Sequence, residues 1–324
     1  MASTPPQAQI VGIRLEAPDV ISLELRPATG APAFQPVTAG AHLDLHLGNG
    51  LVRSYSLTNP GETHRYVVAV KHDPNSRGGS RFVHEQLRVG QTLAIGTPRN
   101  HFALDEEADR AVFVAGGIGI TPIYAMLQRW SALGKPAHLV YCARNREGAA
   151  LLPAIEALQA QNPALLTAQF HYSETQGGAA DLKALLEAHP QDTHFYCCGP
   201  AGMLDAFEQA CAELGHVHSH LERFAASPKA SEQEALPGYT AVLQRSGISV
   251  HVAPGASLLD AIEAAGVHLE YSCREGVCGA CETRVISGDV DHRDHILSPQ
   301  EQAANRSMMV CVSGCRSGQL VLDA

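Results

Sequence analysis

The stretch Tyr271-Ser-Cys-Arg-Glu-Gly-Val-Cys-Gly-Ala-Cys-Glu282 carries the most specific pattern in this chain. Three of its cysteines, Cys273, Cys278 and Cys281, follow a C-x4-C-x2-C spacing, and Cys311 follows after 29 intervening residues (282–310). One loop can aim three successive sulfurs at a common centre, while the fourth sulfur comes from a distant part of the chain. This spacing is typical of four thiolates around two irons, so we predict a [2Fe–2S] cluster with these four cysteines as its ligands.

Two glycines inside the stretch fit such a cluster. Gly276 and Gly279 let the backbone pass close to inorganic sulfide, toward which backbone N–H groups can point. A zinc site or a set of buried free thiols is the alternative, although zinc sites commonly pair two short cysteine knuckles. Here three cysteines fall within 273–281 and the fourth stands alone. The local sequence resembles the plant-type ferredoxin domain.

Composition limits the remaining possibilities. The chain has 324 residues, enough for two or three domains, and 45% of them are hydrophobic. The formal net charge is −10 and no Lys/Arg cluster stands out, so we expect no nucleic-acid partner. The start lacks the features of a secretory signal, and no run of eighteen apolar residues occurs, so we expect no membrane span and a cytoplasmic location. Five further cysteines fit a reducing compartment: Cys142, Cys197, Cys198, Cys211 and Cys315.

The first segment, residues 1–108, is rich in short strand patterns separated by turns. The candidate strands are Gln9–Glu16, Val20–Leu25, His42–Leu47, Leu51–Leu57 and Tyr66–Lys71. The third of these alternates polar and apolar residues, which indicates a half-buried strand. Short, evenly spaced strands with Gly, Pro and Asn turns predict an antiparallel β-barrel.

Two pieces of this segment point to an anion. Arg77-Gly-Gly-Ser80 opens a helix expected over Ser80–Leu87, and N–H groups at a helix start bind phosphate. Arg53-Ser-Tyr-Ser56 supplies an arginine for a charge-assisted contact. Taken alone, each piece is also typical of an ordinary turn or of barrel surface.

Together, R-x-Y-S-L and the later R-G-G-S resemble the flavin domain of the phthalate dioxygenase reductase family. The resemblance implies that Tyr55 lies against the isoalloxazine and Ser56 near its N5. It also implies that Arg53 and the Gly78-Gly79-Ser80 turn hold the phosphate. Relatives that use FAD carry an added adenosine-binding stretch after these glycines, and no such stretch follows here, so the resemblance implies FMN.

The second segment, residues 109–224, changes to alternating strands and helices. Ala111–Ala115 is a buried-strand run, and Gly116-Gly-Ile-Gly-Ile-Thr-Pro122 leads into a helix that ends near Trp130. The later expected elements are strands His138–Cys142, Leu166–Tyr172 and Thr193–Cys197 and helices Ala149–Gln161, Ala180–Ala188 and Ala201–Leu214. The alternation predicts a doubly wound parallel sheet, and its glycine turn predicts a pyrophosphate site.

The motif G-G-x-G-x-T-P together with C-G-P resembles the ferredoxin-NADP reductase superfamily. The residues that carry this resemblance are Gly116, Gly117, Gly119, Thr121, Pro122, Cys198, Gly199 and Pro200. It implies that Cys198-Gly199-Pro200 borders the nicotinamide with Thr121 beside it, although Cys198 alone would also fit a small buried residue at a strand end. It further implies that Phe224 covers the flavin ring with Glu222 nearby. The residues 220–224 by themselves indicate only an amphipathic edge strand.

The choice between NADH and NADPH depends on the residues after the second and third strands of this segment. Family members that prefer NADH place an acid after the third strand, and here Ser173 stands in the acid's place with Glu174 adjacent. Arg144 and Arg146 after the second strand would instead attract a 2′-phosphate. We expect NADH, with NADPH as the alternative.

A polar stretch with two prolines, residues 225–237, indicates a flexible linker to a third domain, residues 238–324. The expected strands are Tyr239–Arg245, Ile248–Val252, Met308–Ser313 and Gln319–Leu322. Ser257 and Ser298 begin two helices with capping-box patterns, and Met308–Ser313 would deliver Cys311 from a strand. These elements predict a small α+β domain of the β-grasp type. Its excess of acids over arginines suggests docking to an electron acceptor or ordinary surface solvation.

Histidines give no such signal. None of the 17 shows i,i+4 metal spacing with a carboxylate, so none is assigned a role, and His292 and His295 are expected in an exposed loop.

The three motif sets agree on one interpretation. The resemblance to the phthalate dioxygenase reductase family covers nearly the whole chain and implies a monomeric electron-transfer reductase. It would carry electrons from NADH through FMN and the [2Fe–2S] cluster to a terminal Rieske non-haem iron oxygenase. The alternatives are a stand-alone iron–sulfur flavoprotein reductase or redox sensor, and a zinc-binding module fused to a flavoenzyme.

Overall fold

The computed structural model describes residues 5–226 and 237–324. They form two compact units, unit 1 and unit 2, and the division between them falls between Arg223 and Phe224. Most of the expected linker, residues 227–236, lies outside the described residues. The expected domain boundaries at residues 108, 224 and 237 stay predictions. Within the described ranges, no helix is both long and apolar enough to cross a bilayer.

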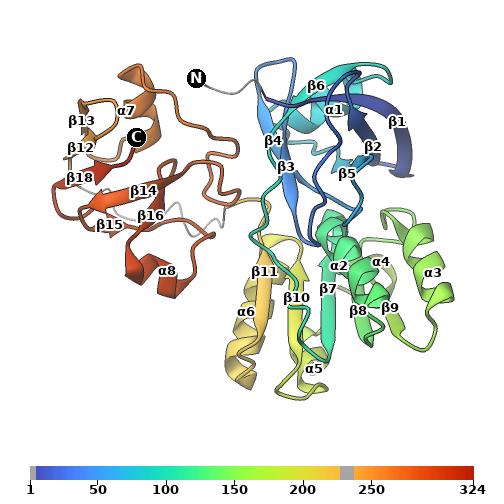
Figure 1. The fold of residues 1–324 in the computed structure, drawn as a ribbon. Coiled ribbons are helices and arrows are strands. Elements are labelled where there is room, and N and C mark those ends of the chain that lie inside the picture. Colours follow the sequence, from blue (N-terminus) through green and yellow to red (C-terminus); the bar gives the residue numbers. More distant parts are fainter. Residues whose placement is uncertain (1–4, 227–236) are drawn as a thin grey trace. The chain divides into compact units, whose positions relative to one another are not determined.

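The first part of unit 1 is an antiparallel sheet of six strands in the order β4-β3-β6-β1-β2-β5 (Figure 1). The strands are β1 (Gln7–Ala17), β2 (Val20–Pro27), β3 (His42–His46), β4 (Val52–Ser56), β5 (Tyr66–Lys71) and β6 (Thr92–Ile95). A β-bridge between Leu57, which directly follows β4, and Val68 of β5 joins the two edge strands of the sheet and closes it into a barrel. The helix α1 (Gly79–Gln86) adds Val83 to the barrel core.

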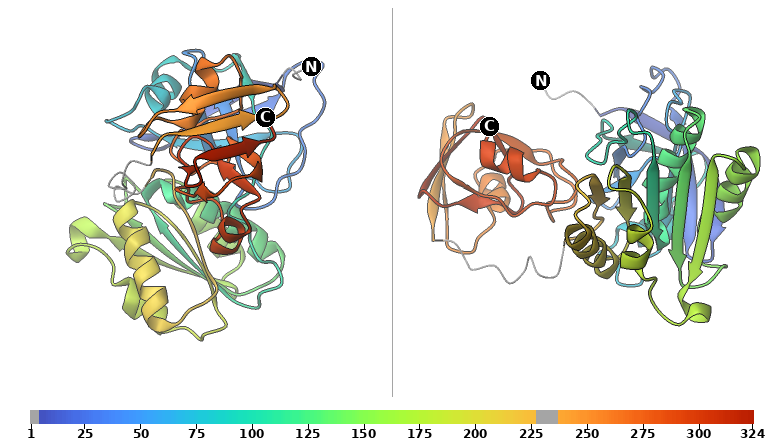
Figure 2. Two further views of the ribbon diagram at one scale, coloured as in Figure 1. Left: turned by 90° about the vertical axis from the view of Figure 1, so that its left-hand side faces the viewer. Right: turned by 90° about the horizontal axis from the view of Figure 1, so that it is seen from below.

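The second part of unit 1 is a parallel sheet in the order β11-β10-β7-β8-β9. The strands are β7 (Ala111–Gly116), β8 (Ala137–Ala143), β9 (Leu166–Tyr172), β10 (His194–Cys198) and β11 (Ser219–Glu222). The helical elements are η1 (Gly117–Gly119), α2 (Ile120–Ala132), α3 (Leu152–Gln161), α4 (Ser173–Gln176), α5 (Leu182–Glu187) and α6 (Ala201–Leu214). Side chains of β7 alternate between two cores: Phe113 packs with α2 and α3, and Val114 packs with α5 and α6. The sheet is therefore covered on both faces, as Figure 2 shows.

Unit 2 contains a mixed five-stranded sheet in the order β13-β12-β18-β14-β16 and a small two-stranded sheet, β15-β17. Its strands are β12 (Tyr239–Leu243), β13 (Ile248–Val252), β14 (Glu282–Ser287), β15 (Val290–Asp291), β16 (Ser307–Met309), β17 (Gly314–Cys315) and β18 (Gln319–Leu322). Its helices are α7 (Leu258–Ala264) and α8 (Pro299–Ala304). Ser298 with Glu301 forms the full capping box predicted for α8, whereas Ser257 caps α7 through its own side chain alone.

The fold class predicted from the sequence is confirmed, while several element predictions are wrong. The helix expected from Ala149 begins only at Leu152, because Leu151 has a left-handed backbone (φ 59°) and Pro153 favours the first turn. The strand expected over Met308–Ser313 ends at Met309, so Cys311 lies in the following turn.

Two burial expectations also fail. β3 is not half-buried, because four of its five residues are buried, including His42 and Asp44. His292 was expected to be exposed, but only 8% of its side-chain surface is accessible, and it lies 3.7 Å from the buried Asp294.

Candidate functional site

The loop that carries three of the cysteines has no regular secondary structure, and its path depends on three left-handed residues. Arg274, Gly276 and Gly279 have φ values of 59°, 68° and 72°. A Cβ atom at Gly276 would lie 2.7 Å from Val312 Cγ2 and 3.1 Å from Asp294 Cα. The loop backbone therefore runs against residues 294 and 312, which brings it next to Cys311.

The four predicted ligands come together in unit 2. The thiol of Cys273 lies beside those of Cys278 and Cys311, and the thiol of Cys311 also lies beside that of Cys281. These contacts allow one pairing that uses each thiol once, Cys273 with Cys278 and Cys281 with Cys311. Two irons that each take two thiolates fit this pairing.

The chemistry of the four thiols fits a positively charged metal centre. The neighbouring Cys273 and burial raise the pKa of Cys278 far above that of an ordinary thiol, so four thiolates would not gather here without a cation. The N–H of Glu275 points at Cys273 Sγ at 3.3 Å, the kind of contact that stabilises ligating sulfur. Within the described ranges, no three His, Cys, Asp or Glu side chains converge as ligands of one metal ion.

Cys315 lies apart from this group. It is buried on β17, and its Sγ contacts Gln319 O at 3.3 Å and Ser317 Oγ at 3.4 Å. The assignment of Cys311 rather than Cys315 as the fourth ligand stays a prediction, and it agrees with these contacts.

The predicted phosphate residues meet at the start of α1. Arg53 on β4 lies so close to Gly79 that a Cβ atom there would be 2.7 Å from Arg53 Cγ. Gly78 precedes the helix with φ 95°, and its N–H donates to Ser76 Oγ at 3.1 Å. The N–H groups of Gly79 and Ser80, which begin the helix, and the Arg53 guanidinium are therefore the donors for an anion.

The two predicted flavin-ring residues lie at the end of β4. Burial raises the pKa of Tyr55 to about 12, so its hydroxyl stays protonated. Ser56 is buried, and its Oγ has no hydrogen-bond partner in the described residues. An unpartnered buried hydroxyl is costly, and a ligand atom that bonds to it would remove that cost.

The two glycine motifs of the parallel sheet are packed directly against each other. A Cβ atom at Gly119 would lie 2.2 Å from Cys198 O, and one at Gly116 would lie 2.6 Å from Pro200 Cδ. A Cβ atom at Gly199 would lie 3.1 Å from Gly116 Cα. These glycines therefore allow the ends of β7 and β10 to approach closely, which opens the turn expected to take a pyrophosphate.

The predicted nicotinamide residues lie around the end of β10. Cys198 is fully buried, and its neighbours in the sheet register are Ala115 on β7 and Glu222 on β11. Thr121 is buried in the first turn of α2, where its Oγ1 donates to Ile118 O at 3.0 Å. Burial raises the pKa of Glu222 to about 8.

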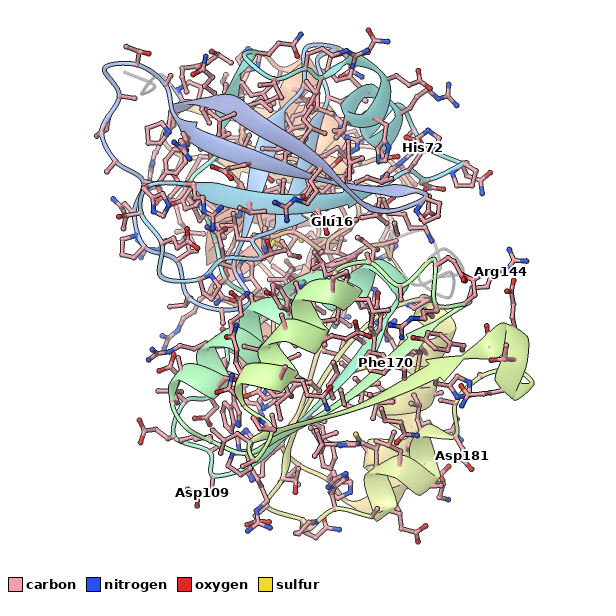
Figure 3. The ribbon with its side chains drawn as sticks, turned by 90° about the vertical axis from the view of Figure 1, so that its right-hand side faces the viewer. Glu16, His72, Asp109, Arg144, Phe170 and Asp181 are labelled. Atoms are coloured by element: carbon pink, nitrogen blue, oxygen red, sulfur yellow. The ribbon has the colours of Figure 1, made fainter. Side chains whose placement is uncertain are left out.

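Arg144 and Arg146, which the sequence placed near the adenosine end of the nucleotide, lie at the end of the parallel sheet that faces the barrel. Figure 3 shows Arg144 at this end, whereas Asp109, which precedes β7, lies at the opposite end. Arg144 Nε donates to Glu174 Oε1 at 2.6 Å, and Asn145 Nδ2 donates to Glu174 Oε2 at 2.9 Å. Arg146 is paired with Glu156 at 2.5 Å.

Phe224 follows β11 and is 43% exposed. It is the first residue of the second unit, and its predicted place over the flavin stays a prediction.

Sequence reasoning missed His42. Its Nδ1 lies 3.8 Å from Glu222 Oε1. The sequence placed His42 on the polar side of a strand predicted to be half-buried, which is typical of a residue that faces solvent, so nothing marked it as a site residue.

Comparisons with known proteins agree with these arrangements. A family model described as an oxidoreductase NAD-binding domain matches residues 113–209. A second, described as a 2Fe-2S iron-sulfur cluster binding domain, matches residues 241–316, which include all four predicted ligands.

A solved phthalate dioxygenase reductase, described as a modular structure for electron transfer from pyridine nucleotides to [2Fe–2S], matches with a TM-score of 0.69. It is 34% identical and covers 98% of this chain and 97% of its own. The chain belongs to the phthalate dioxygenase reductase family. It is an NAD(P)H-dependent oxidoreductase, and its cofactors are FMN, a [2Fe–2S] cluster and NADH.

Two named relatives match over almost their whole length. The "phenoxybenzoate dioxygenase subunit beta" of Ectopseudomonas oleovorans is 47% identical over 98% of this chain and 97% of its own. The "tetrachlorobenzoquinone reductase" of Sphingobium chlorophenolicum is 45% identical over 95% of this chain and 94% of its own. An intact self-sufficient cytochrome P450 monooxygenase also matches with a TM-score of 0.87 and 36% identity over 99% of this chain, which spans 41% of that protein.

Proposed function

We propose that this chain is the reductase component of a multicomponent oxygenase and passes electrons from NADH to a terminal Rieske-type oxygenase. The observation that carries the proposal is the convergence of four thiols in a domain that shares one chain with a nucleotide-binding sheet and a flavin-type barrel. Relatives named as dioxygenase subunits match over almost the whole chain and support an oxygenase as the acceptor.

On this proposal the barrel holds FMN. Arg53, Gly79 and Ser80 bind its phosphate, and Tyr55 and Ser56 lie at the ring. Bound FMN would convert a two-electron hydride donor into a source of single electrons, and the cluster would provide the one-electron outlet.

The parallel sheet binds the nucleotide. The turn after β7 takes the pyrophosphate, because its glycines let the ends of β7 and β10 approach closely and it leads directly into the N-terminus of α2. Cys198, Gly199 and Pro200 border the nicotinamide, with Thr121 and Glu222 beside them. These residues orient the ring and exclude water, and none of them needs to act as a general acid or base.

The preference for NADH rests on Glu174. Its carboxylate binds Arg144 through one oxygen and Asn145 through the other, so the arginine closest to it is already neutralised. Arg146 is likewise paired with Glu156. A 2′-phosphate would have to displace these carboxylates, which disfavours NADPH.

A second function is favoured by a specific feature of unit 2. A cavity of about 230 Å³ is bordered by Cys311 and Arg293, with Tyr239 and Ser257 in its wall. Such a cavity would let a small acceptor approach the cluster without a partner protein. The relative named as a tetrachlorobenzoquinone reductase makes a quinone the class to test.

The two functions are separated by comparing the full chain with residues 1–226. The full chain should support turnover of a terminal oxygenase encoded beside its gene. Residues 1–226 should keep NADH-dependent ferricyanide reduction, because ferricyanide takes electrons from the flavin directly, but should lose oxygenase turnover. Full oxygenase turnover with residues 1–226 would refute the proposed route. Efficient quinone reduction by the full chain, with no activity toward any oxygenase, would establish the second function.

A further inference from the structure

Four polar residues meet between the barrel and the parallel sheet of unit 1. On the barrel side, His42 of β3 lies directly opposite Ser56 of β4 in the strand register. On the other side, Cys198 of β10 lies beside Glu222 of β11. The two pairs are connected, because His42 Nδ1 lies 3.8 Å from Glu222 Oε1.

This contact is shielded from water. The exposed fraction of the side chain is 6% for His42 and 11% for Glu222, and Glu222 Oε2 has no hydrogen-bond partner in the described residues. A carboxylate in such a place needs either a proton or a nearby cation. In the part of the chain that the structure describes, His42 is the one group within ion-pair distance of it.

Arg99, which bridges to His42 between strands, is already paired with an acid. Arg99 Nη2 donates to Asp44 Oδ2 at 2.8 Å, so this arginine is bound to another acid. The ring of His101 lies 5.8 Å from that of His42, centroid to centroid, in a tilted arrangement.

The other groups next to Glu222 supply no free positive charge to its carboxylate. Arg223, the next residue, is bound by Asp205 and Glu208 of α6. The thiol of Cys198 is fully buried, and burial followed by the Glu222 charge keeps its pKa well above the ordinary value, so it stays neutral.

We propose that His42 is a positioning residue for the hydride step, because it supplies the counter-charge to Glu222 and the pair moves one proton between a neutral form and an ion pair. The proton leaves the Glu222 carboxyl and ends on His42 Nδ1, so the total charge is unchanged. The separation of 3.8 Å exceeds a direct hydrogen bond, so the transfer needs a small approach of the side chains or one bridging water. This inference rests on the proposed function, which places the nicotinamide beside Cys198.

The ion pair would favour hydride transfer. A nicotinamide ring becomes positively charged when its hydride leaves, and a fixed carboxylate in a water-poor site stabilises that charge. In the neutral form this stabilisation is missing. Without His42, the Glu222 carboxyl holds its proton to a higher pH, and the hydride step should lose rate in the pH range where the ion pair would otherwise exist.

The test measures the carboxyl directly in the flavin-loaded full chain. The infrared C=O band of protonated Glu222, assigned by its loss in Glu222→Gln, is followed from about pH 5 to pH 10. In His42→Gln the midpoint should rise by about one pH unit, a tenfold change in the protonation equilibrium. His46→Gln is the matched control, because His46 lies on the same strand but is exposed, and its midpoint should equal that of the wild type.

A second readout is the pH profile of flavin bleaching by NADH under single-turnover conditions. Its rising limb should move to higher pH in His42→Gln by the same amount as the carboxyl band. An unchanged midpoint in His42→Gln, or an equal shift in His46→Gln, would overturn the proposal. Should His42→Gln lose its flavin, His42→Asn replaces it in both measurements. If NADH bleaches the flavin in no variant, the proposed function fails, while the carboxyl titration still reports on the pair.

Discussion

Position 119 requires glycine because of a close backbone contact and not because of a ligand. A Cβ atom there would lie 2.2 Å from Cys198 O, so Gly119→Ala must push the glycine turn away from the end of β10. We expect the dissociation constant for NADH to rise at least tenfold, roughly 1.4 kcal/mol, because the pyrophosphate turn loses its shape. Titration of the oxidised protein with a non-reducing NADH analogue measures this constant.

Gly202 provides the matched control, because it lies in α6 with nothing within 4 Å of its Cβ position. Gly202→Ala should leave nucleotide binding unchanged and raise the stability by about 0.5–1 kcal/mol, since alanine is the better helix former. Equal losses of binding in both variants would mean that the contact with Cys198 does not determine the turn.

The fourth cluster ligand can be tested at the level of single atoms. Cys311→Ser should abolish the EPR signal of the reduced cluster, because the thiol of Cys311 joins those of Cys273 and Cys281. Cys315→Ser should keep the signal, because Cys315 Sγ is directed to Gln319 O instead. The opposite result would transfer the ligand role to Cys315.

Glu174 determines nucleotide preference on our account. Glu174→Gln removes the negative charge that Arg144 and Asn145 bind, so Arg144 becomes available to a 2′-phosphate. Since exposed ion pairs are weak, we expect kcat/KM for NADPH to rise roughly tenfold or less, with little change for NADH. Steady-state ferricyanide reduction with both nucleotides measures the ratio. A rise for NADH of the same size would show that Glu174 acts on the fold and not on the phosphate.

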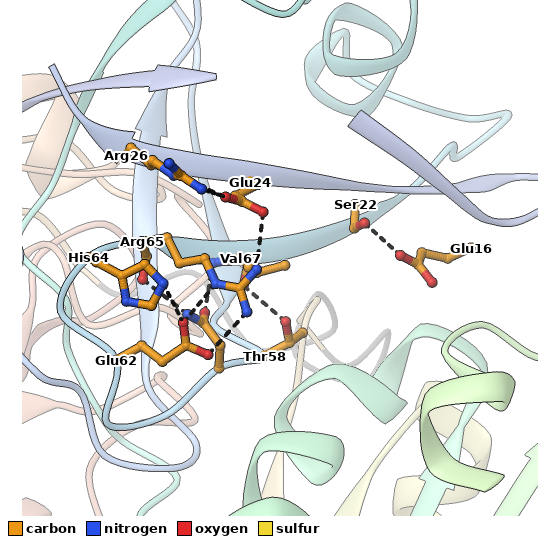
Figure 4. Close-up of polar contacts among 10 residues, drawn as sticks. Glu16, Ser22, Glu24, Arg26, Thr58, Glu62, His64, Arg65 and Val67 are labelled. Atoms are coloured by element: carbon orange, nitrogen blue, oxygen red, sulfur yellow. Dashed lines mark hydrogen bonds and ion pairs between the residues drawn. The ribbon is translucent and has the colours of Figure 1, made fainter. Parts of the chain in front are cut away.

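At the scale of elements, an ion-pair network fastens the β5 end of the barrel to β2. Arg65 donates to Glu62 Oε2 at 2.7 Å and to Glu24 Oε2 at 3.1 Å (Figure 4). The hydrogen bonds from Arg65 hold the pKa of Glu62 below its usual value. A lowered carboxyl pKa stabilises the folded state above the unfolded pKa, and this contribution is lost as the pH falls through the folded pKa.

Arg65→Met should therefore cost more stability at pH 7 than in acid. Because the pair is partly exposed, we expect about 1 kcal/mol or less at neutral pH. Thermal unfolding at a series of pH values would show the melting temperatures of the variant and the wild type converging below the usual glutamate pKa. A difference that stays constant with pH would mean that Arg65 acts through packing alone.

Elements with a clear period were predictable from the sequence, and those set by distant contacts were not. The bounds of β5, β9, β13, α6 and β18 agree with the predicted ones. The short strands β6 and β14 were not predicted, because each depends on pairing with strands far away in the sequence. Cys311 was found from cysteine spacing alone, yet its turn conformation depends on the loop around Gly276, which no local pattern shows.

In the same way, the site residues that belong to motifs could be predicted, and those brought together by tertiary contacts could not. Cysteine and glycine motifs mark chemistry or close backbone approach by residue type and spacing, so their residues could be named in advance. His42 could not be, because its relation to Glu222 exists only where a barrel strand meets the edge of the parallel sheet. Similarly, the approach of Arg53 to Gly79 follows from barrel closure rather than from either motif.

In the whole molecule, hydride transfer and the one-electron outlet belong to different units. Unit 1 contains both the barrel and the parallel sheet, which share a core that includes Phe102, Phe113 and Trp130. Hydride transfer needs reacting atoms about 3–3.5 Å apart, which a shared core can hold in place. Unit 2 has its own core and its own sheet, so it can serve as a separate electron outlet.

The central claim is that electrons from NADH leave through the cluster of unit 2. The most direct test is anaerobic addition of NADH to the intact chain, followed by rapid freezing and EPR. We predict that the flavin bleaches and that the signal of a reduced [2Fe–2S] cluster then appears, with an amplitude close to that produced by dithionite. Bleaching of the flavin without a cluster signal, in protein whose cluster dithionite does reduce, would contradict it.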